Sequence, residues 1–174
     1  ENKVADHTLD MGLIESPSHH PNLITQVCCE DELVMICAPF SDLSKLECVS
    51  PKQVATHPYI SRESGSGTRA CIDDFFKLNG VSLDEINLVM ELGSREAIKG
   101  AVAAGLGVAV VSSTTVAKEV KLGELVAICL NPPLRRQLSL VYPQEKFRSK
   151  LLQSFLDFLE KSSLIKEYAL TRPI

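Results

Sequence analysis

The feature that most constrains the fold is a regular alternation of strand-like and helix-like segments between residues 59 and 130. Apolar runs rich in β-branched residues predict strands at 59–61, 88–92, 108–112 and 125–130. Amphipathic segments between them predict helices at 68–78, 95–104 and 115–121. This order is typical of right-handed βαβ units, so we expect an α/β fold with a parallel-rich sheet and helices on both of its faces.

The flanking segments predict a second lobe that is interrupted by the first. Further strands are expected at 9–15, 33–38 and 138–142, and a long helix at 147–164. These elements do not close into a complete sheet. We therefore expect a discontinuous first lobe, residues 1–57 and 129–174, and a second lobe, residues 58–128. Because residues 2–8 resemble the end of a helix, we expect the chain to be a fragment of a longer protein.

Charge and hydropathy exclude several classes of protein. The chain has 174 residues, with 18 basic and 22 acidic side chains and a net charge of −4. An acidic balance disfavours non-specific binding of nucleic acid by this chain. No apolar run reaches the roughly 18 residues of a membrane span, so no membrane association is expected.

The six cysteines show no pattern of metal or disulfide chemistry. They are Cys28, Cys29, Cys37, Cys48, Cys71 and Cys129, without any C-x-x-C pair. Cys37 and Cys129 lie in apolar stretches, where a thiol behaves as a small core residue. We expect reduced, structural cysteines in a cytoplasmic protein. The alternative is a redox sensor, for which Cys28 and Cys29 would be the candidates.

A loop rich in glycine and hydroxyl groups follows the strand at 59–61. Gly65 and Gly67 allow a ligand to approach the backbone, and Ser64, Ser66 and Thr68 add hydroxyls beside the start of the next helix. The simpler interpretation is that Ser66 or Thr68 only caps that helix. Three hydroxyls and two glycines exceed what a cap requires, and we expect this loop to bind a ligand.

A second junction repeats the arrangement after the strand at 88–92. Gly93 and Ser94 open the helix at 95–104, with Ser94 at the N-cap position. If the two strands are parallel neighbours, both helix N-termini meet at one edge, which suits a small anionic or polar ligand. Arg69 and Arg95 are weaker candidates, because arginines on helix surfaces are usually solvated.

Enzyme signatures are not found. Residues 64–69 do not match G-x-S-x-G, and residues 105–107 precede a strand, which is the wrong order for a dinucleotide loop. His19 and His20 lie in a Ser/Pro-rich turn, which favours an exposed loop over a metal site. We expect no catalytic residues, no metal and no cofactor.

An ordered set of motifs resembles the LysR-type transcriptional regulators. The segments DMGLIE at 10–15 and EDELV at 30–34 resemble their first lobe. The segments ESGSGTR at 63–69, LGSREAIK at 92–99 and AGLGVA at 104–109 resemble their second lobe. The resemblance covers nearly the whole chain, in the order of the family.

The resemblance implies an effector-binding domain with a type II periplasmic-binding-protein-like fold, in which a small molecule occupies the cleft between two lobes. Ser64, Ser66, Gly67, Thr68, Gly93 and Ser94 would then bind the effector from the second lobe, and Glu15, Ser16 and Pro17 from the first. It also implies dimers through this domain, with tetramers of the full-length protein. DNA would be bound only by a winged helix-turn-helix outside this chain. The alternative is a solute-binding protein of a transporter.

Overall fold

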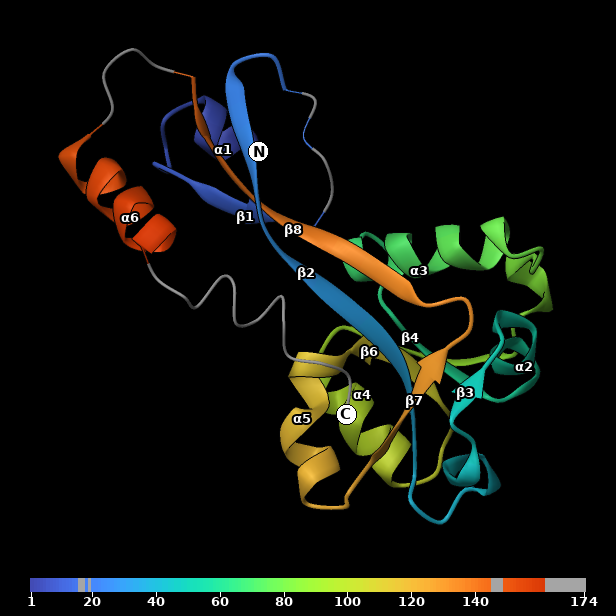
Figure 1. Ribbon diagram of the computed structural model, residues 1–174. Helices are drawn as coiled ribbons and strands as arrows, with labels where there is room; N and C mark the ends of the chain where they lie inside the picture. The colour runs from blue at the N-terminus through green and yellow to red at the C-terminus, as the bar shows by residue number, and fades with distance from the viewer. Residues whose placement is uncertain (16–17, 19, 145–148, 162–174) are drawn as a thin grey trace. The chain divides into compact units, whose positions relative to one another are not determined.

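The computed structural model describes residues 1–15, 18, 20–144 and 149–161 (Figure 1). Its helices are α1 (Asn2–Ala5), α2 (Pro51–Thr56), α3 (Gly67–Leu78), α4 (Arg95–Ala103), α5 (Ser113–Lys121) and α6 (Lys150–Lys161), with 3-10 turns η1 (Asp42–Lys45) and η2 (Leu83–Glu85). Its strands are β1 (Gly12–Ile14), β2 (Leu23–Cys37), β3 (Cys48–Val49), β4 (Tyr59–Arg62), β5 (Leu88–Leu92), β6 (Ala109–Ser112), β7 (Val126–Leu130) and β8 (Leu134–Pro143).

The described chain forms two compact units. Among the described residues, unit 1 holds those up to residue 31 together with 136–144 and 149–161, and unit 2 holds residues 32–135. These boundaries differ from the expected ones after residues 57 and 128. The reason is β2, whose second half pairs with β6 and β7 and so belongs to unit 2.

Unit 2 combines parallel pairs with one antiparallel strand. β4 pairs in parallel with β5, and β3 with β7, while a parallel bridge joins Tyr59 to Val108. β2 runs antiparallel to both β6 and β7. The expected parallel pairs are present, but the sheet is mixed and not parallel-rich, because β2 pairs antiparallel with β6 and β7.

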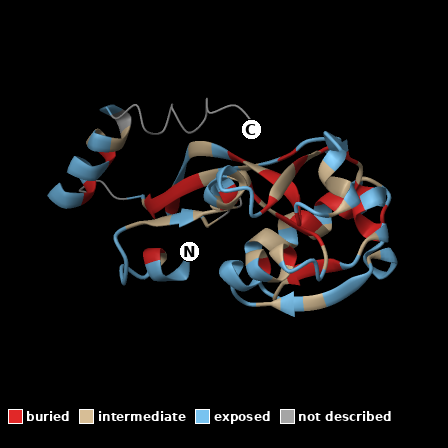
Figure 2. Cartoon of the chain, turned by 90° about the horizontal axis from the view of Figure 1, so that it is seen from below, coloured by how far each residue is buried: buried red, intermediate tan, exposed pale blue. Residues whose placement is uncertain are grey.

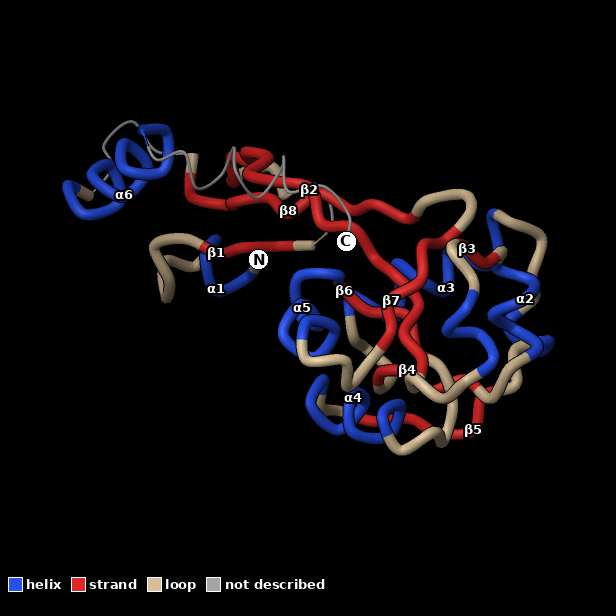
Figure 3. Tube along the Cα trace, turned by 60° about the horizontal axis from the view of Figure 1, so that its bottom comes forward, coloured by secondary structure: helices blue, strands red, loops and turns tan. Residues whose placement is uncertain are grey.

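Alternate residues of β2 face two different hydrophobic layers of unit 2. Leu33, Met35 and Cys37 lie in one cluster with side chains of α2 and α3. Val34 and Ile36 lie in another with side chains of α4 and α5. Successive side chains of a strand point to opposite faces, so the period of two gives each face its own helical cover. Figure 3 shows the strands of unit 2 between these two helix pairs.

In unit 1, alternate residues of β8 likewise face two different hydrophobic clusters. β8 lies between β1, its antiparallel partner, and β2. Leu140 and Tyr142 of β8 contact side chains of α6, whereas Val141 contacts Val4 of α1. Figure 2 shows that burial is concentrated on the central strands and on one side of the helices, whereas other strands are largely exposed.

Most of the expected elements are present within a residue or two of their predicted ends. The larger differences concern four elements. β2 begins ten residues earlier than the predicted 33–38, and β8 begins at Leu134, four residues before the predicted 138–142. β1 begins at Gly12, three residues after the start of the predicted 9–15, and α2 was not predicted. α2 has a capping box between Ser50 and Gln53, with Pro51 as its first residue. Of the helix predicted at 147–164, the structure describes α6 (Lys150–Lys161). The ends of the predicted range, residues 147–148 and 162–164, lie outside the described residues. No helix among the described residues is long and apolar enough to cross a membrane.

Candidate ligand-binding site

The first part of the site is the turn between β4 and α3. Ser66 caps α3, its hydroxyl accepting a hydrogen bond from the N–H of Arg69 at 3.5 Å. Gly65 has a φ of +88°, a left-handed conformation that glycine adopts without strain. The predicted cap at Ser66 is thus confirmed. The left-handed conformation of Gly65 lets the chain turn tightly just before the helix.

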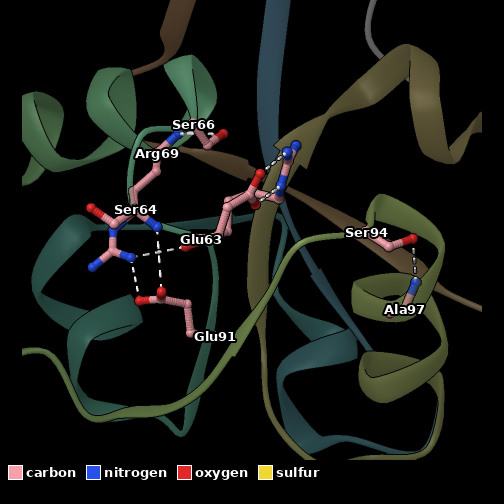
Figure 4. Close-up of polar contacts among 8 residues, drawn as sticks. Glu63, Ser64, Ser66, Arg69, Glu91, Ser94 and Ala97 are labelled. Carbon is pink, nitrogen blue, oxygen red and sulfur yellow. Dashed lines mark hydrogen bonds and ion pairs between the residues drawn. The ribbon is translucent and has the colours of Figure 1, made fainter.

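The second part is the turn between β5 and α4. The Ser94 hydroxyl accepts a hydrogen bond from the N–H of Ala97 at 3.4 Å, which confirms the predicted cap. β4 and β5 are parallel neighbours, and each is followed directly by its helix. The N-termini of α3 and α4 therefore begin at the same edge of this strand pair, as Figure 4 shows.

A carboxylate of the protein occupies part of the first turn. Glu91 of β5 accepts a hydrogen bond from the backbone N–H of Ser64 at 3.3 Å and another from the guanidinium of Arg69. These two donors lower the pKa of Glu91. Arg69 also donates to the backbone oxygen of Arg62 at 3.0 Å. Arg69 is therefore held in place by β4 and β5 and is not a solvated surface residue.

A second ion pair lies at the end of β4. The guanidinium of Arg62 donates to both carboxylate oxygens of Glu63, at 2.7 and 2.8 Å. This bidentate contact lowers the pKa of Glu63 to about 2. With Asp73 Oδ2 3.6 Å from Nε of Arg69, the turn holds two cations and three carboxylates. It carries no excess positive charge, so an anion would have to be bound by N–H groups and hydroxyls.

The predicted ligand-binding residues of unit 2 are accessible to different extents. Ser64, Gly67, Gly93, Ser94 and Arg95 are exposed, and Ser66, Thr68 and Arg69 are half-buried. Glu91 was missed by the sequence interpretation. The sequence does contain a signal for Glu91, because it is the one charged residue in the apolar strand LVMEL.

The predicted residues of the first lobe lie in unit 1. Glu15 accepts a hydrogen bond from Arg136 at 2.6 Å, and Arg136 also donates to Asp31 at 2.8 Å. Ser16 and Pro17 lie outside the described residues. Within the described part of the chain, no three His, Cys, Asp or Glu side chains form a group that could hold a metal ion.

Comparison with known proteins identifies the family. The family described as the LysR substrate binding domain matches residues 1–163. The chain belongs to this family. It is 37% identical over 163 residues to the HTH-type transcriptional regulator YeiE of Escherichia coli K12, covering 92% of this chain and 54% of YeiE. It is 32% identical over 162 residues to the RuBisCO operon transcriptional regulator of Acidithiobacillus ferrooxidans, covering 92% of this chain and 52% of that protein. The chain thus spans about half the length of these LysR-family relatives.

Solved structures of LysR regulatory domains share the fold. The regulatory domain of Synechocystis PCC6803 CcmR, solved in complex with 2-PG, matches with a TM-score of 0.81 and 26% identity, over 99% of this chain and 79% of that one. The effector binding domain of QuiR, solved with shikimate, matches with a TM-score of 0.80 and 18% identity, over 97% of this chain and 78% of that one. The periplasmic-binding-protein-like fold is confirmed. The names of these relatives are those of regulators, which favours a non-enzymatic effector-binding domain over a transporter component.

Proposed function

We propose that this LysR-family domain binds a small anionic or polar effector through the two serine-containing turns of unit 2, and that units 1 and 2 are the two lobes of the effector-binding domain. The observation that carries the proposal is the parallel pairing of β4 and β5, which starts α3 and α4 at one edge. Ser64, Ser66, Gly67 and Thr68 would bind from one turn, and Gly93 and Ser94 from the other.

The chemistry of the turns favours an effector that combines hydroxyl groups with a modest negative charge. Helix N-termini and hydroxyls bind such groups, while the carboxylates of Glu63 and Glu91 repel a highly charged anion. An effector that takes the N–H of Ser64 has to displace Glu91 from that donor. Glu15 of unit 1, with Ser16 and Pro17, and Arg69 and Arg95 of unit 2 are secondary candidates for contact.

The first experiment is a thermal-shift titration of the chain with 2-PG, the ligand named for CcmR, and with inorganic phosphate and sulfate; glycerol serves as a neutral control. A ligand at a hundred times its Kd stabilises the folded state by about 2.7 kcal/mol, so saturating doses give a clear shift. A saturable shift with an anion supports the proposal. Equal responses to glycerol, or none to any probe, contradict the assignment of an anionic effector to these turns.

Variants of Ser94 separate its proposed contact with the effector from its role as the N-cap of α4. Ser94→Asn keeps a side-chain cap on α4 but replaces the hydroxyl by a neutral carboxamide, whereas Ser94→Asp keeps the cap and adds a charge that repels an anion. We expect weakened binding in the first variant and a larger loss in the second, at nearly unchanged stability. Ser50→Ala removes a comparable cap at α2 and should leave affinity unchanged. If Ser94→Asp binds as tightly as the wild type, Ser94 does not contact the effector.

We further propose that effector binding regulates transcription in the cytoplasm, through dimers of this domain and tetramers of the full-length protein. The family membership and the names of the relatives, which describe HTH-type regulators, support this assignment. DNA contact belongs to a helix-turn-helix domain outside the matched residues 1–163. Sedimentation of the chain at increasing concentration should show a dimer, and a monomer at all concentrations would contradict this part of the proposal.

A further inference from the structure

Two cysteines that are 81 positions apart in the sequence lie directly opposite each other in unit 2. Cys48 of β3 and Cys129 of β7 are register partners in a parallel strand pair. The thiol of Cys48 lies near enough to that of Cys129 to raise the pKa of Cys129. Cys48 is exposed and Cys129 is half-buried, so Cys129 is not the core residue that its apolar stretch predicts. The two thiols meet at a place that a small reagent can reach.

The strand pattern fixes both thiols on one face. The next register pair, Val49 and Leu130, is buried in the cluster formed with α2 and α3. Because side chains alternate between the faces of a sheet, Cys48 and Cys129 point to the opposite face. Neighbouring strands lie about 4.8 Å apart, which is within the roughly 4.4–6.8 Å between Cα atoms of a disulfide.

We propose that Cys48 and Cys129 form a reversible disulfide when the chain meets a hydroperoxide. The sulfur of Cys48, as the exposed partner, attacks the peroxide; its S–H proton leaves with the displaced oxygen as water or alcohol, and Cys48 becomes a sulfenic acid. The sulfur of Cys129 then attacks the sulfenic sulfur. The S–S bond forms, the S–O bond breaks, and the hydroxyl leaves as water with the proton of Cys129. Two thiols are oxidised by two electrons, and one peroxide bond is reduced.

The position of the pair favours an accessible and reducible bond. β3 has only two residues and lies at the end of its sheet, so it can shift toward β7 as the bond forms. Burial and the neighbouring Cys48 raise the pKa of Cys129, so the exposed Cys48 is the thiol that reacts with the peroxide first. Exposed disulfides are the ones that cellular thiols reduce most readily.

The other described cysteines lack this arrangement. Cys28 and Cys29 are adjacent in β2, where successive side chains point to opposite faces. Cys71 lies on α3, is half-buried like Cys129, and serves as the control cysteine. The sequence interpretation considered Cys28 and Cys29 as the redox candidates. The register of β3 and β7 assigns that role to a different pair.

Peptide mapping tests the proposal on the whole chain. The reduced chain is treated with stoichiometric hydrogen peroxide, blocked with N-ethylmaleimide and digested with trypsin. Cys48 is the single cysteine of peptide 46–52, and Cys129 is the single cysteine of peptide 122–135. We expect these two peptides to appear linked, with a mass lower by two hydrogen atoms than the sum of the free peptides, and to separate again on treatment with dithiothreitol.

Cysteine variants and an unfolded control test whether the disulfide is specific to Cys48 and Cys129 in the folded chain. Cys48→Ser and Cys129→Ser should each abolish the linked species, whereas Cys71→Ser should leave its yield unchanged. In urea, oxidation should give a mixture of pairings in place of this one. Recovery of both cysteines as maleimide adducts after peroxide treatment would overturn the proposal. So would a linked species that is equally abundant in the unfolded chain, or peroxide oxidation confined to the other four cysteines.

Discussion

A buried ion pair in unit 1 allows a quantitative test of the structure. The side chains of Arg136 and Asp31 are 8% and 6% exposed, and their atoms approach to 2.8 Å. Arg136 also pairs with Glu15, whose side chain is 36% exposed, at 2.6 Å. The substitution Arg136→Leu removes the cation that neutralises both carboxylates while keeping an apolar side chain in β8.

The expected cost comes mainly from Asp31. Removing one partner of a buried ion pair costs about 3–5 kcal/mol, because the other charge stays buried without its counter-ion. The pair with Glu15 adds at most about 1 kcal/mol, because that carboxylate is partly solvated. We expect a destabilisation of about 4 kcal/mol. With a urea slope of about 2–3 kcal/mol per M, the midpoint should fall by about 1.3–2 M.

The adjacent residue supplies the control. Arg135 is 56% exposed and lies 3.9 Å from Glu32, so Arg135→Leu should cost less than about 1 kcal/mol. Urea unfolding followed by far-ultraviolet circular dichroism compares the two variants. The double variant Arg136→Leu/Asp31→Leu should recover most of the stability, since an apolar pair replaces a buried ion pair at little cost. Equal midpoints for Arg135→Leu and Arg136→Leu, or a double variant as unstable as Arg136→Leu, would refute the reasoning.

Three further predictions follow from local geometry. Gly107→Ala places a Cβ 2.5 Å from the backbone carbonyl oxygen of Pro58 and should destabilise the chain by about 1–3 kcal/mol. Gly100→Ala adds a Cβ in open space within α4 and should stabilise the chain by about 0.5–1 kcal/mol. Urea unfolding measures both effects. The pKa of Glu63 is lowered from 4.5 to about 2, so its contribution to stability is complete above pH 4.5 and is lost as the pH falls toward 2; a carboxyl NMR titration midpoint near 4.5 would contradict this. A disulfide between Cys48 and Cys129 closes a loop of about 80 residues, worth up to about 4.5 kcal/mol, so calorimetry should show a higher Tm for the oxidised chain and no difference in Cys48→Ser.

The strand and helix pattern between residues 59 and 130 was readable because local signals and tertiary structure agree there. The strand at 88–92 and the helix at 95–104 have sharp ends, set by Ser94 at the start and by Gly105, with a φ of +78°, after the end. Ile98 and Val102 are buried four positions apart in the helix, so its side chains alone indicate which face is inside. Ser66 and Ser94 were both identified as candidate caps by the same local rule, whereas Ser50, which caps α2, was not.

The sequence was a poorer guide where long-range pairing decides the structure. The first part of β2, from Leu23, carries polar residues such as Gln26 and Glu30 among apolar ones, and no compact apolar run marks it as a strand. Its strand conformation follows from pairing with β8, more than 100 residues away. The position of the boundary between the units depends on a different long-range pairing, that of the second half of β2 with β6 and β7.

By itself, the sequence determined the α/β class, the two capped turns and the LysR-family motifs, because each depends on residues close together in the chain. The tertiary structure alone decided which distant side chains meet. It placed Glu91 on the turn of Ser64, Asp31 beside Arg136, and Cys48 beside Cys129. Such contacts depend on strand order and register, and a shift of one residue would turn each side chain to the other face.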